Sequence, residues 1–199
     1  GGDCEKHDPG DCTNLATNGG AEDGGIGSDW YWHRAPGAPR RPAGFFDVDS
    51  SKARSGANSW QWNLPSGAYV NQASVGVAHA IPAFLAPNAI YVLSAQIYSE
   101  MTAGYARISY MHRETWADLC PAFSTRKNQW EHVCCEFTVG ETDNIARSDE
   151  IFVRMVVDGT GAAGKVWFDD LSLVQKDCPG DGGSCDDTTP PTPRCDDGI

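Results

Sequence analysis

Several features that would assign this 199-residue chain to a familiar class are missing from it. No apolar run approaches the ~18 residues that a membrane-spanning helix needs. Long apolar patterns with the 3.6-residue spacing of an amphipathic helix are also missing, which disfavours a helical bundle. The patterns G-x-S-x-G, H-E-x-x-H and the phosphate-binding P-loop do not occur, so the hydrolases and nucleotide-binding proteins that carry them find no support.

Basic side chains are few. The chain has 15 Lys and Arg against 27 Asp and Glu, which gives a formal net charge of −12. Residues 1–12 and 176–199 together hold ten of the acidic and three of the basic side chains. Because negative charge repels phosphate groups, we expect no nucleic acid and no anionic membrane as a partner. The acidic ends either attract divalent cations or keep the protein in solution.

A catalytic constellation is also missing. Carboxylates are plentiful, but glycoside hydrolysis needs two of them held ~5 to 9.5 Å apart across a cleft, and no spacing in the sequence fixes such a pair. The histidines at 33, 79, 112 and 132 are scattered and have no obvious nucleophile beside them. We therefore expect that the protein is not an enzyme.

The eight cysteines predict disulfides and an oxidising, extracellular location, either secreted or at the cell surface. They stand mostly in Gly-, Asp- and Pro-rich segments, at Cys4, Cys12, Cys120, Cys134, Cys135, Cys178, Cys185 and Cys195. No C-x-x-C pair occurs, so a zinc site has little support. We expect Cys120, in a loop after Trp116, to pair with Cys134 or Cys135. The other cysteines would pair among themselves and with the remaining member of that doublet.

Short strand-like runs fill the region between the cysteine-rich ends. They cover 59–62, 73–80, 90–98, 105–111, 131–139, 151–158 and 165–174. Short strands separated by Gly, Asn, Asp and Pro predict an all-β fold, namely an antiparallel β-sandwich of the jelly-roll type. The segment 30–42, with three arginines and three prolines, is unlike a usual strand.

The chain thus divides into a Cys/Asp/Gly-rich N-terminal segment (1–13), a β-sandwich domain (14–175) and a Cys-rich Thr/Pro/Asp linker or tail (176–199). The tail contains a Thr/Pro tract that favours an extended polyproline-type backbone and suits O-glycosylation at Thr188, Thr189 and Thr192. No N-x-S/T acceptor occurs, so we expect no N-linked glycan.

Six short motifs follow one another between about residues 14 and 175. They are Asn14 to Gly24, Ser55-Gly56-Ala57-Asn58-Ser59, Tyr91-Val92-Leu93-Ser94, Trp130-Glu131-His132-Val133, Phe137-Thr138 and Trp167-Phe168-Asp169-Asp170-Leu171-Ser172-Leu173. In this order they resemble the motifs of the jelly-roll carbohydrate-binding modules of families 4, 9 and 22, in the galactose-binding-like group. The resemblance implies an extracellular, non-catalytic module that binds a glycan. One departure is Ala21, where that family usually has an aromatic residue before the Glu of the opening motif.

The last motif carries two adjacent carboxylates in a strand-like alternation. Alternation places Val166, Phe168, Asp170 and Ser172 on one face of the strand, and Trp167, Asp169, Leu171 and Leu173 on the other. A carboxylate that is buried among such residues needs a cation or several hydrogen-bond donors. We therefore expect either a metal ion or fixed backbone contacts at this pair.

The family resemblance assigns these carboxylates to a structural calcium ion. It implies that Glu22 and Asp169 tie the first and last strands together through Ca²⁺, with backbone carbonyls and Asp49 or Ser51 as further ligands. The alternative without metal is that Glu22 and Asp169 accept backbone hydrogen bonds at a turn.

A glycan site needs exposed aromatic rings flanked by polar side chains. The candidate ligand-binding residues are Trp30, Trp32, Trp60, Trp62, Arg107, Arg113 and Trp116. Alternation puts Trp60 and Trp62 on one face of their strand, which is either the sandwich interior or a sugar-binding surface. Arg107, Ser109, Met111 and Arg113 share one face of another strand, which is either a ligand face or a solvated one. We expect Trp130 and Trp167 to be structural.

Two functions remain open from sequence. The first is a secreted, non-catalytic module whose partner is a glycan or polysaccharide. The second is a structural subunit or repeat unit of an extracellular filament, surface coat or adhesin, which self-associates into a polymer through its terminal segments. The motifs of the central region favour the first function, and the linker-like ends favour the second.

Overall fold

The computed structural model of the chain describes residues 14–24, 30–33, 45–66, 74–80, 85, 88–112, 118–139, 151–176 and 185. These residues form eight strands and no helix, in agreement with the predicted all-β fold. The described part therefore holds no helix long and apolar enough to cross a membrane. The strands are β1 (Trp30–His33), β2 (Phe46–Asp49), β3 (Ser59–Leu64), β4 (Ser74–Ala80), β5 (Ile90–His112), β6 (Asp118–Phe123), β7 (Trp130–Thr138) and β8 (Ile151–Gln175).

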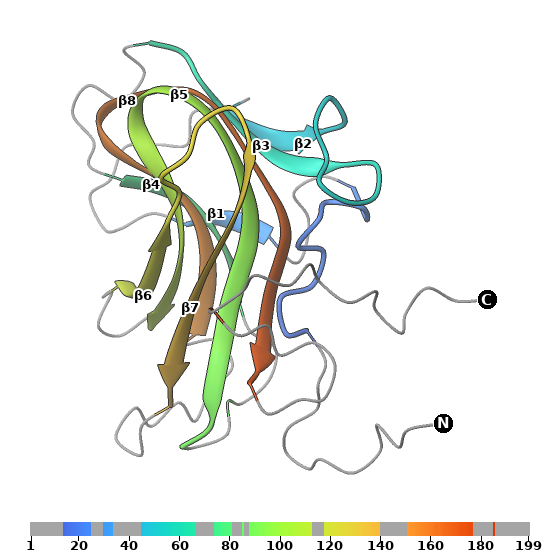
Figure 1. The fold of residues 1–199 in the computed structure, drawn as a ribbon, viewed down its shortest axis with the longest axis vertical. Helices are drawn as coiled ribbons and strands as arrows, with labels where there is room; N and C mark the ends of the chain where they lie inside the picture. Colours follow the sequence, from blue (N-terminus) through green and yellow to red (C-terminus); the bar gives the residue numbers. More distant parts are fainter. Residues whose placement is uncertain are drawn as a thin grey trace.

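Two long strands, β5 and β8, run through both layers of an antiparallel sandwich. They pair from Tyr91 opposite Gln175 to His112 opposite Ile151. In Figure 1 both strands rise through one layer, bend over at one end of the molecule and descend through the other layer. The predicted runs at 90–98 and 105–111 are therefore two halves of β5, and those at 151–158 and 165–174 are two halves of β8.

Each layer is completed by three shorter strands. The first layer has the order β1-β4-β8-β5-β6, in which β4 pairs with residues 152–158 of β8 and β6 pairs with residues 107–111 of β5. The second layer has the order β2-β3-β8-β5-β7, in which β3 pairs with residues 164–168 of β8 and β7 pairs with residues 90–98 of β5. This arrangement is the β-sandwich that the sequence predicts.

Glycines allow β5 and β8 to bend between the layers. Gly164 has φ +109°, and a Cβ there would lie 2.6 Å from the Cα of Met101. Gly104 has φ +79°, and a Cβ there would lie 2.4 Å from the carbonyl oxygen of Asp158. A side chain at either position would clash with the neighbouring strand, and the positive φ favours glycine as well. The pairing register shifts on both sides of Ala103, which marks the bend in β5.

The core between the layers contains a cluster of large aromatic rings. Phe46 stacks on Trp60 with ring centroids 5.2 Å apart and packs against Trp62 at 4.9 Å. The indole N–H of Trp60 donates to the carbonyl of Asn18 at 3.0 Å, so the opening motif is tied to the core. Aliphatic side chains fill the rest of the core, among them Leu93, Ile97, Ile108, Val153, Met155 and Leu173. Burying a side chain of this size contributes about 1.5–3 kcal/mol.

Two sequence expectations about strands are wrong. The segment 30–42 is unlike a usual strand in sequence because of its prolines and arginines. Its residues 30–33 nevertheless form β1 and pair with β4, with Trp30 opposite His79. Cys120, expected in a loop, lies within β6. It has a positive φ of 53° at the point where the β5–β6 register shifts. The irregular backbone breaks the side-chain alternation by which a strand is predicted from sequence.

Candidate functional site

Asp169 of the closing motif is fully buried and bonded to backbone amides. Its Oδ2 accepts hydrogen bonds from the N–H of Arg54 at 2.6 Å and of Ser55 at 3.2 Å, and its Oδ1 accepts from the N–H of Asp170 at 2.8 Å. Burial, and then the charge of Asp170, raise the pKa of Asp169 to about 6. The three amide bonds oppose this rise by favouring the charged form.

The strand does not keep the simple alternation expected for the closing motif. Asp170 has a positive φ of 50°, and the pairing register with β5 shifts beside it. As a result Leu171 and Leu173 join Val166 and Phe168 in the core cluster, whereas Asp169 stays on the opposite side. The predicted grouping of Leu171 and Leu173 with Asp169 is therefore wrong.

Glu22 and Asp169 hold the same chain segment. Oε1 of Glu22 accepts hydrogen bonds from the N–H of Ala57 at 3.0 Å and of Asn58 at 2.9 Å. Together the two carboxylates bind the backbone of residues 54–58, which leads into β3. We call this arrangement the carboxylate clamp.

The clamp offers oxygen atoms beside glycines. A Cβ at Gly20 would lie 3.0 Å from Oδ1 of Asp169, and a Cβ at Gly56 would lie 2.4 Å from Oε1 of Glu22. The backbone at Gly20 and Gly56 therefore packs closely against the two carboxylates, and a side chain at either position would crowd them. Their oxygens are hard ligands of the kind that Ca²⁺ prefers, and the contacts that they make here are those of the alternative without metal, in which Glu22 and Asp169 accept backbone hydrogen bonds.

Asp49, the third metal ligand expected from sequence, is engaged elsewhere. Its Oδ1 accepts hydrogen bonds from the N–H and Oγ of Ser51 and from Nε1 of Trp167 at 3.1 Å. Burial acts to raise the pKa of Asp49, but the bonds from Ser51 and Trp167 outweigh it and lower the pKa. In the described ranges, no group of three or more His, Cys, Asp and Glu side chains is placed to hold a metal ion.

The structure places three of the candidate sugar-binding tryptophans in the sandwich interior. Trp30 is 1% exposed, and Trp60 and Trp62 are fully buried. A sugar-stacking ring must present a face to solvent, so these three do not form a surface platform. The side chains of Trp32, Arg113 and Trp116 lie outside the described residues.

Arg107 lies on the side of the first layer that faces away from the core. Ser109 and Met111 share this side on β5, and Arg154 and Asp158 share it on β8, as the pairing registers require. All five are buried, and Arg107 forms an ion pair with Asp158. We call this side the arginine face, and its defining residues are Arg107, Ser109, Met111, Arg154 and Asp158.

Two exposed aromatic rings lie at the end of the arginine face. Tyr105 and Phe123 are 47% and 45% exposed, and their ring centroids are 5.5 Å apart in an edge-to-face contact. The guanidinium carbon of Arg107 lies 5.9 Å from the centre of the Phe123 ring. Sequence reasoning missed this pair. Tyr105 could have been predicted, because alternation along β5 places it on the same side as Arg107. Phe123 could not, because its position depends on the pairing of β6 with β5.

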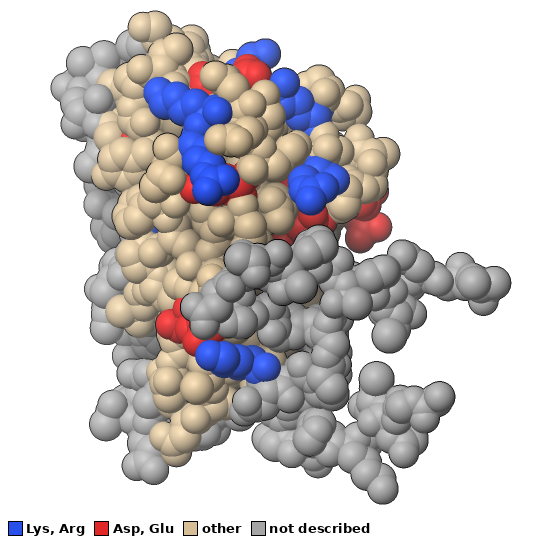
Figure 2. All heavy atoms as spheres, viewed as in Figure 1, with Lys and Arg blue, Asp and Glu red and all other residues tan. Residues whose placement is uncertain are grey.

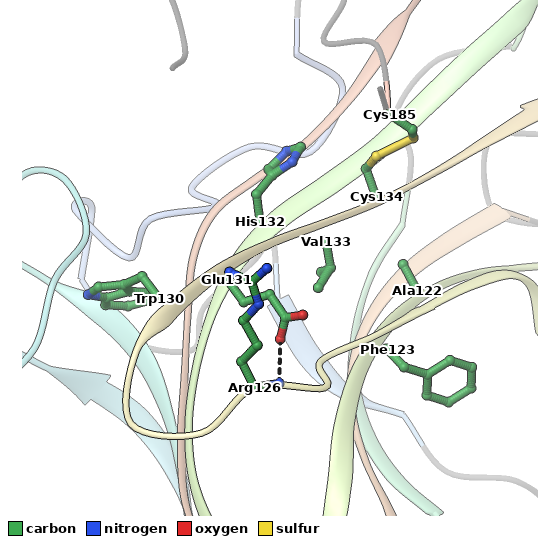
Figure 3. A pocket seen from close by; sticks show the side chains of 9 residues that line it. All are labelled: Ala122, Phe123, Arg126, Trp130, Glu131, His132, Val133, Cys134 and Cys185. Atoms are coloured by element: carbon green, nitrogen blue, oxygen red, sulfur yellow. Dashed lines mark hydrogen bonds between the residues drawn. A yellow bond between two sulfur atoms is a disulfide. The ribbon is translucent and has the colours of Figure 1, made fainter. Parts of the chain in front are cut away.

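A groove of about 430 Å³ runs beside this aromatic pair, between β6 and β7. It is lined by Ala122, Phe123, Arg126, Trp130, Glu131, His132, Val133, Cys134 and Cys185, and we call it the edge groove. Figure 3 shows Arg126 and Glu131 near its middle, with Trp130 to one side and Phe123 to the other. Phe123 thus belongs both to the aromatic pair and to the groove.

Two disulfides fasten the edge at which the groove lies. Cys120 of β6 is bonded to Cys135 of β7, one of the two pairings expected for Cys120. Cys134 is bonded to Cys185, which places Cys185 at the wall of the groove. The remaining sequence expectations for the ends concern residues outside the described part, namely Cys4, Cys12, Cys178, Cys195, Thr188, Thr189 and Thr192.

Solved structures with this fold include a carbohydrate-binding module. "Family 16 Carbohydrate Binding Module-2" is 20% identical with a TM-score of 0.54, and the match covers 81% of this chain and 99% of that one. A cyclase from Fischerella sp. TAU is 15% identical with a TM-score of 0.59 over 81% and 96% of the two chains. An α-L-arabinofuranosidase, MgGH51, is 15% identical with a TM-score of 0.57 over 83% of this chain and 27% of its own.

These TM-scores, at identities of 20% or less, show a shared fold alone: the chain has the jelly-roll sandwich that a carbohydrate-binding module, a cyclase and part of a glycosidase also have. No protein-family model matches the sequence, and no curated protein matches it.

Proposed function

We propose that the protein is an extracellular, non-catalytic module that binds a glycan at the exposed aromatic pair of Tyr105 and Phe123. The observation that carries this proposal is the position of Tyr105 and Phe123, two half-exposed rings in contact beside the Arg107–Asp158 ion pair. Flat pyranose faces stack on such rings. The Arg107–Asp158 ion pair is buried, so it supports the sheet beneath the rings instead of contacting the sugar.

Fold and covalent structure support the proposal. One solved structure with the same sandwich is a carbohydrate-binding module. Two disulfides favour an oxidising, extracellular location. In the edge groove, both carboxylate oxygens of Glu131 accept hydrogen bonds from residues 124–126 and hold this loop in place. A loop held in this way suits a preformed binding site.

A glycan array followed by calorimetric titration of the best ligand tests the proposal. We expect Tyr105→Ala and Phe123→Ala each to weaken binding by roughly tenfold, about 1.4 kcal/mol. Leu119→Ala is the matched control, since Leu119 is another exposed apolar side chain of β6, at 41% exposure. Silence of the wild-type protein across soluble and insoluble polysaccharides would reject the function. Equal losses in all three variants would reject the site.

We also propose that Glu22 and Asp169 hold a structural calcium ion, completed by backbone carbonyl oxygens. Both groups supply hard carboxylate oxygens and both meet the chain segment 54–58, which supports this proposal. A bound cation would stabilise the folded state by mass action, so a chelator should lower the thermal midpoint and added Ca²⁺ should restore it. An unchanged thermal midpoint in excess chelator would contradict the proposed structural calcium ion.

A further inference from the structure

The edge groove continues directly from the proposed sugar-binding pair. Phe123 contacts Tyr105 on one side and lines the groove on the other. The groove volume of about 430 Å³ falls within the range of about 300–1,000 Å³ that ligand pockets occupy. A chain molecule that stacks on the aromatic pair therefore has space to extend past Phe123.

The loop that carries Arg126 into the groove is held in place. Oε2 of Glu131 accepts hydrogen bonds from the N–H of Thr125 at 2.8 Å and of Arg126 at 2.9 Å, and from the Oγ of Ser124 at 2.9 Å. Burial acts to raise the pKa of Glu131, but these bonds outweigh it and lower the pKa. The charged carboxylate therefore fixes the loop before any ligand arrives, which reduces the entropy that binding costs.

Trp130 at the far end of the groove belongs to a row of three aromatic rings across the second layer. Tyr98 makes edge contacts with Trp130 at 5.6 Å and with Trp167 at 5.8 Å. The ammonium group of Lys52 lies over Tyr98 at 4.6 Å and over Trp167 at 5.1 Å. Lys52 thus covers the other two rings, while Trp130 is half-buried and lines the groove.

We propose that the glycan site extends from Tyr105 and Phe123 through the edge groove, so that a further sugar unit binds between Arg126 and Trp130. Trp130 provides an aromatic surface for the sugar ring, and Arg126 donates hydrogen bonds to its hydroxyls. The module therefore prefers a long oligosaccharide to a short one. This inference rests on the proposed glycan-binding function.

The charges around the groove favour a neutral sugar. Arg126 and Glu131 balance each other in the lining, and the whole chain carries −12. On the face that Figure 2 shows, basic and acidic side chains lie next to one another instead of forming a patch of one sign. A polyanionic glycan would gain little from the groove and would be repelled by the protein as a whole.

The test is a length series of neutral β-1,4-linked gluco-, manno- and galacto-oligosaccharides, from disaccharide to hexasaccharide, with oligogalacturonate as the anionic probe. We expect wild-type affinity to rise with length. Arg126→Ala and Trp130→Ala should remove roughly tenfold of the affinity for the hexasaccharide and leave that for the disaccharide unchanged. Tyr105→Ala should weaken binding of both lengths.

Matched variants separate binding from folding. Lys127→Ala is the control for Arg126→Ala, because Lys127 is the next residue of the loop but its Nζ donates to the carbonyl of Met101 at 2.8 Å, outside the groove lining. Trp130→Phe accompanies Trp130→Ala, since it keeps a ring against Tyr98 and should retain part of the affinity. An unchanged thermal midpoint for Arg126→Ala shows that any lost affinity is a local effect.

The two proposals fail in different ways. If the wild-type protein binds no glycan, the proposed function falls and the extended site falls with it. If binding depends on Tyr105 but the Arg126 and Trp130 variants bind the hexasaccharide at full strength, only the extended site is wrong. Tighter binding of oligogalacturonate than of every neutral probe would overturn the assignment to a neutral sugar.

Discussion

Asp158 and Asp169 lie on the same strand, β8, and both are buried, but the fold compensates their charges differently. Asp158, in the first layer, forms an ion pair with Arg107 across a sheet face. Asp169, in the second layer, accepts three backbone N–H bonds, two of them from the segment before β3. The first arrangement joins two side chains, whereas the second joins a side chain to the backbone amides of a distant chain segment.

This difference separates a contact between two neighbouring strands from a fastening of the backbone. The Arg107–Asp158 ion pair joins side chains of β5 and β8, two strands that are already paired through their backbones. The carboxylate clamp, in contrast, sets the position of residues 54–58 and so the start of β3. The aromatic pair adjoins the ion pair, and Glu22 adjoins Asp169 in the clamp.

The largest expected effect is the loss of the ion pair. Asp158→Ala removes the carboxylate that pairs with the buried guanidinium of Arg107, and breaking a buried pair costs about 3–5 kcal/mol. Urea denaturation at neutral pH measures the loss. The double variant Arg107→Met with Asp158→Leu removes both charges together and should recover most of the stability. A cost below about 1 kcal/mol for Asp158→Ala would show that the pair is not a buried charge contact.

The next effect is a pH dependence caused by Asp169. Because its pKa is raised to about 6 in the folded protein, the folded state holds this proton more tightly than the unfolded state does. Stability should therefore fall as the pH rises from about 4 to about 6, by up to about 3 kcal/mol from this group. Denaturation across this range, in the presence of a chelator, measures the change.

Asp169→Asn is the control for the pH dependence, since it has no proton to lose. The wild-type protein should lose stability relative to Asp169→Asn between about pH 4 and pH 6. Parallel curves for the two proteins would mean that the amide bonds of residues 54, 55 and 170 offset burial fully. In that case the fold would compensate the charge of Asp169 as fully as the ion pair compensates that of Asp158.

The smallest expected effect comes from the more exposed half of the carboxylate clamp. Glu22→Ala removes the acceptor of the Ala57 and Asn58 amides, and since water can reach these groups the cost should be about 1 kcal/mol. Amide hydrogen exchange should quicken at Ala57 and Asn58 before it changes in β3. Unchanged exchange at both amides would show that Glu22 does not hold this chain segment.

Particular residues show which strands and side-chain positions the sequence predicts. Alternation predicted the strands around Arg107 and Asp169 and the common side of Arg107, Ser109 and Met111, because a strand repeats every two residues. Alternation failed at Asp170, where a positive φ breaks the repeat, and at Cys120, where an irregular register hides β6. Backbone conformations of this kind are compensated by distant contacts, which local patterns do not contain.

The site shows the same limit. Aromatic content alone directed attention to Trp30, Trp60 and Trp62, because large rings serve both cores and sugar sites. Burial separates the two uses: these rings are in the interior, whereas Tyr105 and Phe123 are half exposed. Phe123 reaches Tyr105 only through the pairing of β6 with β5, a long-range contact that no local spacing indicates.

The sequence by itself determined the all-β class, the order of most strands, the presence of disulfides and the pairing of Cys120 to within one residue. Periodicity, turn residues and cysteine positions are local properties, so they can be read along the chain. The tertiary structure decided that β5 and β8 span both layers, that Arg107 pairs with Asp158, and that the exposed aromatics meet the edge groove at Phe123. These features depend on which strands become neighbours, because only burial and pairing across the sheet bring their residues together.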